Sequence, residues 1–173
     1  MLASFSKISP VNLPAALVSE FAEYLNFSGF DAPPAELGRF LNFAISAVER
    51  HTKRGAFRAE YIAVYSADGE NGFKLPVFPA REIISVTVDG VKVSGELKAA
   101  GGGYCVSLAT AASGTVEVVF SAGYDDAFPL PEVYKAAIFA VGADLWEHRE
   151  SQSEISLHEN KTVKFILQTL DMP

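Results

Sequence analysis

Hydrophobic residues follow two different spacings along this chain. They recur every three or four positions over residues 16–25, 37–48 and 132–149, which is the spacing of a buried helix face. Pro14 and Pro131 precede or open two of these segments, at positions where a helix accepts proline. We therefore expect a helix starting near Asn12 or Leu13, a second over about 35–52, and a third over 132–149.

Between the second and third helices the hydrophobic residues alternate with polar ones. The alternating segments are short and are separated by Gly, Asp, Asn or Pro: 59–66, 72–78, 83–89, 91–97, 104–108 and 115–120. This pattern predicts an antiparallel β unit. Its clearest hairpin is centred on Asp89-Gly90, since these two residue types accept the positive φ angles of a two-residue turn.

The third helix is the element around which the rest of the chain is organised. Residues 136–143 are all small or hydrophobic, so no face of this section looks fully solvated. Such a helix is buried on several sides. The burial can lie inside its own domain or against another copy of the chain, and small residues such as Ala140 and Gly142 allow close helix approach in either case.

These elements predict an α+β protein, mainly a helical bundle with an inserted antiparallel β unit between the second and third long helices. We expect one domain over 1–173. Its parts are the N-terminal helices (1–57), the β unit (58–124), the long central helix (130–150), and a polar linker with a short helix (151–173). The β unit is expected to be an appendage of the helical scaffold.

Composition is that of an ordinary globular protein, with 49% hydrophobic and 20% charged residues. No apolar run approaches the ~20 residues of a membrane span, and the N-terminus lacks the hydrophobic core of a signal peptide. We therefore expect synthesis in the cytoplasm and no membrane partner. The net charge of −7 argues against a general nucleic-acid binder, but it is compatible with a protein past which DNA slides.

Candidate chemistry is sparse, and each candidate has a structural alternative. Asp144 and His148 share a helical face but lack further metal ligands, so a hydrogen bond is favoured. Residues 101–103 (Gly-Gly-Gly) precede no helix, which favours a hairpin connection over a phosphate loop. Asp125 and Asp126 are expected to cap backbone amides rather than to act as acid and base. Cys105, the single cysteine, is expected to be buried. We predict no enzyme activity, no metal and no cofactor.

Three groups of residues match, in order, the motifs of a known protein family. The first is the apolar helix pattern that ends in Thr52-Lys53-Arg54-Gly55, in which the glycine falls later than in the family. The second is the proline-containing strand from Leu75 that leads into Ile83-Ile84-Ser85-Val86. The third group follows the family's order and spacing: Ala122-Gly123-Tyr124, Pro129-Leu130-Pro131, Val133, Lys135-Ala136-Ala137-Ile138 and Trp146-Glu147-His148-Arg149-Glu150.

Together these groups resemble the bacteriophage head-to-tail connector (adaptor) family of siphophages, prophages and gene transfer agents. This resemblance implies a structural virion protein that forms a ring, commonly of twelve copies. The ring would lie in the virion neck, between the portal and the next tail-completion or stopper protein, and DNA would pass through it without sequence-specific binding. Assembly would take place in the host bacterial cytoplasm. Another neck or tail-completion role is the alternative within phage assembly. A small hydrolase or a carbohydrate-binding β module is the alternative from a different class.

Two sets of residues are candidates for protein contacts. The subunit interface would use one helix: Ala136, Phe139, Ala140, Ala143, Trp146 and Arg149. The short helix after the polar segment 151–160 would dock on the portal, or alternatively on its own core, through Val163, Phe165, Ile166, Leu167 and Leu170.

Overall fold

The computed structural model describes residues 1–9, 13–27 and 35–147. The chain divides into two compact units. One contains Met1–Val11 and Lys53–Pro129, and the other contains Asn12–Thr52 and Leu130–Pro173. The first is the β unit and the second the helical unit, and each is described by itself. That residues 1–173 form a single domain stays a prediction.

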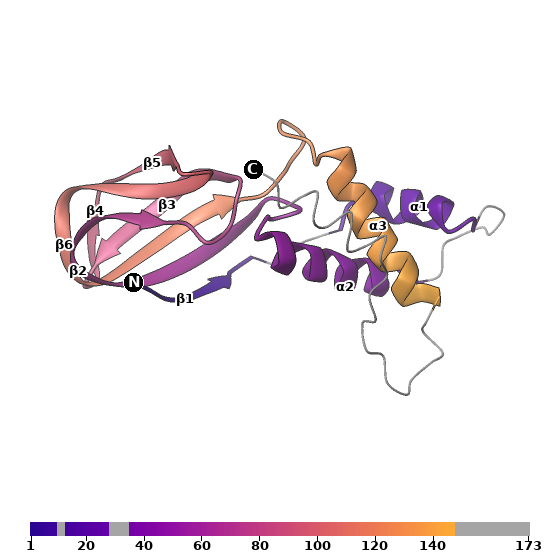
Figure 1. Ribbon diagram of the computed structural model, residues 1–173, viewed down its shortest axis with the longest axis horizontal. Coiled ribbons are helices and arrows are strands. Elements are labelled where there is room, and N and C mark those ends of the chain that lie inside the picture. The colour runs from indigo at the N-terminus through magenta and orange to yellow at the C-terminus, as the bar shows by residue number, and fades with distance from the viewer. Residues whose placement is uncertain (10–12, 28–34, 148–173) are drawn as a thin grey trace. The chain divides into compact units, whose positions relative to one another are not determined.

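The β unit is one antiparallel sheet (Figure 1). Its strands lie in the order β1-β2-β6-β3-β4, and β5 pairs with the first part of β6. The six strands are β1 (Leu2–Lys7), β2 (Ala59–Lys74), β3 (Ala80–Val88), β4 (Val91–Val93), β5 (Gly95–Ala100) and β6 (Gly103–Ala122).

The sheet folds over on itself because its two longest strands change neighbours along their length. Residues 103–108 of β6 pair with β5, whereas residues 116–122 pair with β3. β2 carries register shifts between Asp68 and Gly72, and the rings of Tyr65 and Phe73, which flank these shifts, lie 5.2 Å apart. The two halves thus share one core, whose fully buried members include Val86, Val106, Val116, Val118 and Phe120.

Both predicted hairpin turns are confirmed. Asp89 and Gly90 join β3 to β4 with φ angles of 48° and 81°. Gly101 and Gly102 join β5 to β6, also with positive φ. Glycine suits both turns because it has no side chain that positive φ would bring against the backbone.

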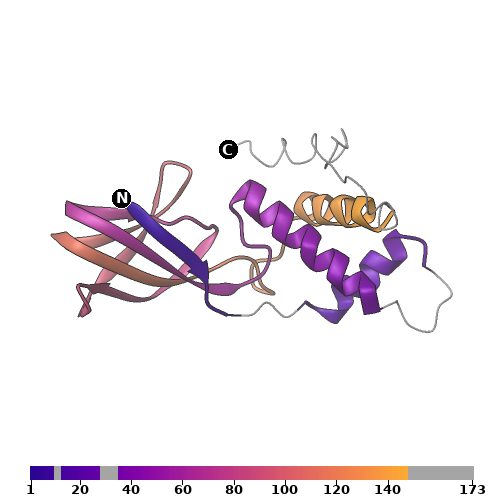
Figure 2. The same cartoon turned by 90° about the horizontal axis from the view of Figure 1, so that it is seen from below.

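The helical unit contains α1 (Ala15–Tyr24), α2 (Ala35–Thr52) and α3 (Glu132–Glu147), shown in Figure 2. These agree with the predicted helices over the residues that the structure describes. α2 turns Leu37, Leu41 and Val48 inward, and α3 turns Tyr134 and Ile138 inward. The Thr52 and Tyr134 hydroxyl oxygens lie 3.0 Å apart, which ties the end of α2 to the start of α3.

The prediction of a mainly helical bundle is wrong. In residues 1–9, 13–27 and 35–147, most of the regular structure is a six-stranded antiparallel sheet with a core of its own, accompanied by three helices. The predicted strands 59–66 and 72–78 merge into β2, and 104–108 and 115–120 merge into β6. Gly69 and Gly114, taken as breaks between short strands, lie inside the long ones with positive φ. Gly69 falls at a register shift, where an extra residue bends a strand without ending it.

Candidate interaction surfaces

Two of the predicted interface residues of α3 are used inside the helical unit. Phe139 is buried, and its ring lies 5.4 Å from that of Phe21 and 5.5 Å from that of Tyr24, both in α1. Trp146 is partly buried and meets the rings of Phe27 and Phe40 edge-on, at 5.4 Å each. These aromatic contacts fix α3 against its neighbours in the unit.

The small residues of the set lie on a different face of α3. Ala136 is exposed, and Ala140 and Ala143 are partly exposed. Their spacing of four and three residues places them in one row, together with Val133, which is 49% exposed. This row is the α3 face that another protein could contact. Arg149 lies outside the described residues.

The predicted portal-docking residues also lie outside the described residues. They are Val163, Phe165, Ile166, Leu167 and Leu170, together with the polar segment 151–160 before them.

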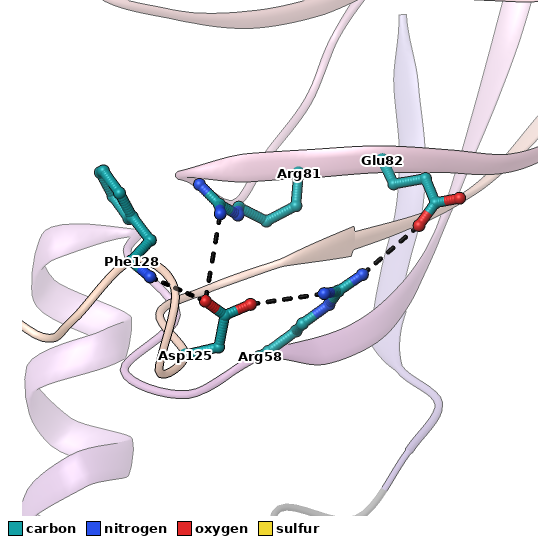
Figure 3. Close-up of polar contacts among 5 residues, drawn as sticks. All are labelled: Arg58, Arg81, Glu82, Asp125 and Phe128. Atoms are coloured by element: carbon teal, nitrogen blue, oxygen red, sulfur yellow. Dashed lines mark hydrogen bonds and ion pairs between the residues drawn. The ribbon is translucent and has the colours of Figure 1, made fainter.

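A charged cluster closes one end of the β unit (Figure 3). The Asp125 carboxylate lies 3.3 Å from the Arg58 guanidinium and 4.0 Å from that of Arg81. Arg58 also reaches Glu82 at 3.4 Å. Arg58 and Glu82 are about half exposed or more, so the two ion pairs of Arg58 each contribute at most about 1 kcal/mol to stability.

The role of Asp125 in this cluster is structural. Its Oδ1 accepts a hydrogen bond from the backbone N–H of Phe128 at 2.9 Å, which holds the turn after β6. The Phe128 ring stacks on Tyr124 with an interplanar angle of 3°, and the Arg81 guanidinium also lies over the Phe128 ring, 4.6 Å from its centroid. The prediction that Asp125 caps a backbone amide is confirmed.

The candidate chemistry gains no support among the described residues. No group of three or more His, Cys, Asp or Glu there could hold a metal ion, and no described helix is long and apolar enough to cross a membrane. His148, one member of the Asp144 pair, lies outside the described ranges. Cys105 lies in β6 and is partly exposed, so the expectation that it is buried is wrong. Val106 and Leu108 of this strand are buried in the core, and Cys105 alternates with them, so its side chain points to the opposite face of the sheet.

Two shifted pKa values have structural causes. Burial raises the pKa of Tyr65 to about 12, and the Tyr65 hydroxyl donates a hydrogen bond to the Lys74 carbonyl at 2.7 Å. A hydrogen bond to Glu20 at 2.9 Å raises the pKa of Lys135 and links α3 to α1. The Tyr65 hydroxyl thus keeps the proton that it donates, and Lys135 keeps its positive charge beside Glu20, so both groups stabilise the fold.

The N-terminal strand is a surface that the sequence analysis missed. β1 is the terminal strand of the sheet, and all six of its residues are exposed. Leu2, Phe5 and the following Ile8 are 38%, 50% and 51% exposed. A hydrophobic edge strand of this kind is a place where another chain can pair.

These observations describe a two-unit α+β protein whose candidate sites are protein-contact surfaces. No protein-family model matches the chain, and no curated protein matches it. Solved structures do resemble it. A chain of the neck of an empty GTA particle, computed with C6 symmetry, has a TM-score of 0.75 and 21% identity, covering 98% of this chain and 96% of that chain.

Two further structures agree. A chain of the virion of a native gene transfer agent (GTA) particle has a TM-score of 0.76 and 19% identity, covering 98% of this chain and 95% of that chain. A chain of the neck of a native GTA particle, computed with C12 symmetry, has a TM-score of 0.74 and 20% identity, covering 100% and 96%. The protein therefore has the fold of proteins found in gene transfer agent particles, two of them in necks.

Proposed function

We propose that the protein is a structural component of the neck of a phage-like particle, in which copies of it form a ring. The observation that carries this proposal is the likeness to neck chains over nearly the full length of both proteins. The likeness spans the β unit and the helical unit, so it is more than a common β or helical module. The C6 and C12 symmetries of the two neck structures support a ring of six-fold or twelve-fold order.

Within the neck, we assign the protein the place of an adaptor between the portal and a tail-completion or stopper protein. The support is the motif pattern, above all Ala122-Gly123-Tyr124 and Pro129-Leu130-Pro131 before α3. DNA would pass through the ring without sequence-specific binding, and a net charge of −7 would disfavour tight binding of phosphates. Assembly would occur in the bacterial cytoplasm, without enzymatic action by this protein.

Subunit contacts in the ring would use the exposed face of α3. Ala136, Ala140 and Ala143 leave room for a neighbouring element to approach closely, while the adjoining Phe139 and Trp146 anchor the helix inside its own unit. Contacts that run head to tail and close on themselves make a ring. Segment 151–173 would dock on the portal through the apolar residues named above.

A different neck or tail-completion protein is the second candidate, because the comparison structures are named as neck and virion only. The experiment that separates the two is a binding assay with purified portal. An adaptor binds the portal directly, and the complex shows a ring by electron microscopy. A later neck component binds only after another protein has covered the portal.

A further inference from the structure

The open edge of β1 has a row of hydrophobic side chains on one side. Leu2 pairs with Tyr65 and Phe5 pairs with Ala63, and both partners are buried in the core of the sheet. Paired residues of an antiparallel sheet point to the same side. Leu2 and Phe5 therefore lie on the core side of the sheet, yet at its rim, where they stay substantially exposed.

The opposite edge of the same sheet has an unfilled place. β4 pairs with Val86, Thr87 and Val88 of β3 and leaves the first part of that strand at the edge. A notch of about 420 Å³ opens beside it, lined by Ile83, Ile84, Ser85, Val86, Lys92, Val93, Ser94 and Gly95. Ile83 and Val86 pair with the buried Phe120 and Val118, so the notch lies on the core side as well.

The β1 edge and the β3 edge run in opposite directions and carry their hydrophobic side chains on the same side of the sheet. β1, β2, β6 and β3 alternate in direction, so β1 and β3 run opposite ways. A second copy displaced along the sheet without being turned over would present its β1 antiparallel to β3. Its Leu2 and Phe5 would then lie on the side where the notch opens.

We infer that β1 of one copy adds to the β3 edge of the next copy, with Phe5 entering the notch beside Ile83 and Val86. Backbone hydrogen bonds would give affinity, and the fit of Phe5 would give specificity, as in other cases of strand addition. The contact joins two different surfaces, so it can propagate around a ring. This inference rests on the proposed ring and names one of its interfaces.

The features of the two edges argue against indiscriminate pairing. β3 has register shifts at Arg81 and Ile84, and bulges of this kind make an edge irregular. A strand that pairs there needs a matching side chain for the notch, which β1 offers in Phe5. Pairing of β1 with β1 is the competing arrangement. It needs a two-fold axis and stops at a dimer.

Cysteine cross-linking of rings assembled on portal tests this contact. In a Cys105→Ser background, Phe5→Cys and Ile83→Cys are prepared as separate single variants and oxidised with Cu(II)–phenanthroline. We expect a cross-linked dimer when the two are mixed and none when either is alone. A chain with both substitutions should give a ladder of cross-linked oligomers. Dimers of Phe5→Cys alone would show β1–β1 pairing and overturn the inference.

Substitution of the hydrophobic side chain supplies a second measurement. Phe5→Ser should raise the concentration needed for ring formation about tenfold, because burial of a half-exposed Phe is lost. Phe43→Ser is the matched control, since Phe43 is 65% exposed and lies on α2 of the helical unit, outside the two strands of the proposed contact. Rings that form normally in Phe5→Ser and never cross-link in the mixture would refute the strand contact and leave the proposed ring intact. Absence of any ring with wild-type protein would refute the proposed function itself.

Discussion

Gly142 in α3 lies directly against the ring of Phe21 in α1. A Cβ atom placed on Gly142 would come within 2.7 Å of the Phe21 Cζ atom and 3.6 Å of the Ala44 Cβ atom in α2. The glycine thus lets the three helices of the unit meet at one point. The sequence left open whether the small residues on α3 serve packing within the unit or contact with another copy. Gly142 serves packing within the unit.

Gly142→Ala should therefore destabilise the protein, although alanine favours helices. Overpacking costs about 1–3 kcal/mol and helix propensity returns up to about 1 kcal/mol, so we expect a net loss of about 1 kcal/mol in the free energy of unfolding. Gly38→Ala in α2 is the control, because nothing lies within 4 Å of its added Cβ. It should stabilise by about 0.5–1 kcal/mol. Urea unfolding followed by circular dichroism at 222 nm measures both, and equal effects would contradict the packing argument.

The buried hydroxyl pair of Thr52 and Tyr134 should show energetic coupling. Thr52 donates to the Val48 carbonyl at 2.8 Å, which leaves its oxygen to accept from Tyr134 at 3.0 Å. A double-mutant cycle with Thr52→Val and Tyr134→Phe should give a coupling of about 1 kcal/mol. Additive effects of the two substitutions on the free energy of unfolding would mean that the hydroxyls do not interact.

Asp125 should tolerate loss of its charge better than loss of its oxygen. Asp125→Asn keeps an acceptor for the Phe128 N–H and removes only the charge that pairs with Arg58 at 3.3 Å and Arg81 at 4.0 Å, so it should lower the free energy of unfolding by about 1 kcal/mol or less. Asp125→Ala removes the acceptor and the charge, and should lower the free energy of unfolding by about 1–2 kcal/mol. Thermal unfolding at low and high salt distinguishes the two contributions. The opposite ranking would make the ion pairs the main role of Asp125.

Tyr65 should make stability fall at high pH. Its pKa is raised from 10.0 to about 12 in the folded protein, so the unfolded chain loses this proton first. Tyr65 therefore makes its full contribution to the free energy of unfolding below pH 10. This contribution is lost as the pH rises toward 12, at up to about 1.4 kcal/mol per pH unit. The stability advantage of the wild type over Tyr65→Phe should narrow over this range in urea unfolding. A difference in the free energy of unfolding between wild type and Tyr65→Phe that stays constant up to pH 11.5 would contradict the raised pKa of Tyr65.

The exposed face of α3 should respond to charge in assembly but not in folding. Ala136→Glu places a carboxylate on an exposed position, so the monomer should fold as the wild type does and fail to form rings. Asn42→Glu, with the same kind of substitution on an exposed position of α2, is the control and should assemble. Light scattering and circular dichroism give the two readouts. Rings of Ala136→Glu would remove this face from the interface.

The helices could be predicted from the sequence because each carries a complete local signal. Residues 35–52 show an apolar stripe whose members Leu37, Leu41 and Val48 are all buried, and Pro131 marks the start of α3. The partners of the other faces of α3 could not be predicted. Packing inside a unit and packing between copies both select small and aromatic residues, so the sequence does not distinguish them. The structure assigns Phe139 and Gly142 to the inside.

The strands were harder to predict because their continuity depends on partners far away in the sequence. β2 and β6 pair along most of their length and pass through Gly69 and Gly114 without ending, although both glycines are typical of turns. β1 was missed because its register shifts between Leu2 and Ser4, which breaks the alternation of Leu2 and Phe5. A regular period of two would have revealed it. This strand then proved to be the clearest unpaired edge of the sheet.

Electron cryomicroscopy of the purified protein mixed with portal shows directly whether copies of this chain form a ring. The proposal that copies of this chain form a closed neck ring rests on the likeness to neck chains over 96–100% of each chain. We expect a ring seated on the portal, with twelve-fold or six-fold symmetry and one fold of the kind described here in each subunit. Portal particles that stay bare at saturating protein, with the added chain remaining a monomer in solution, would contradict the account.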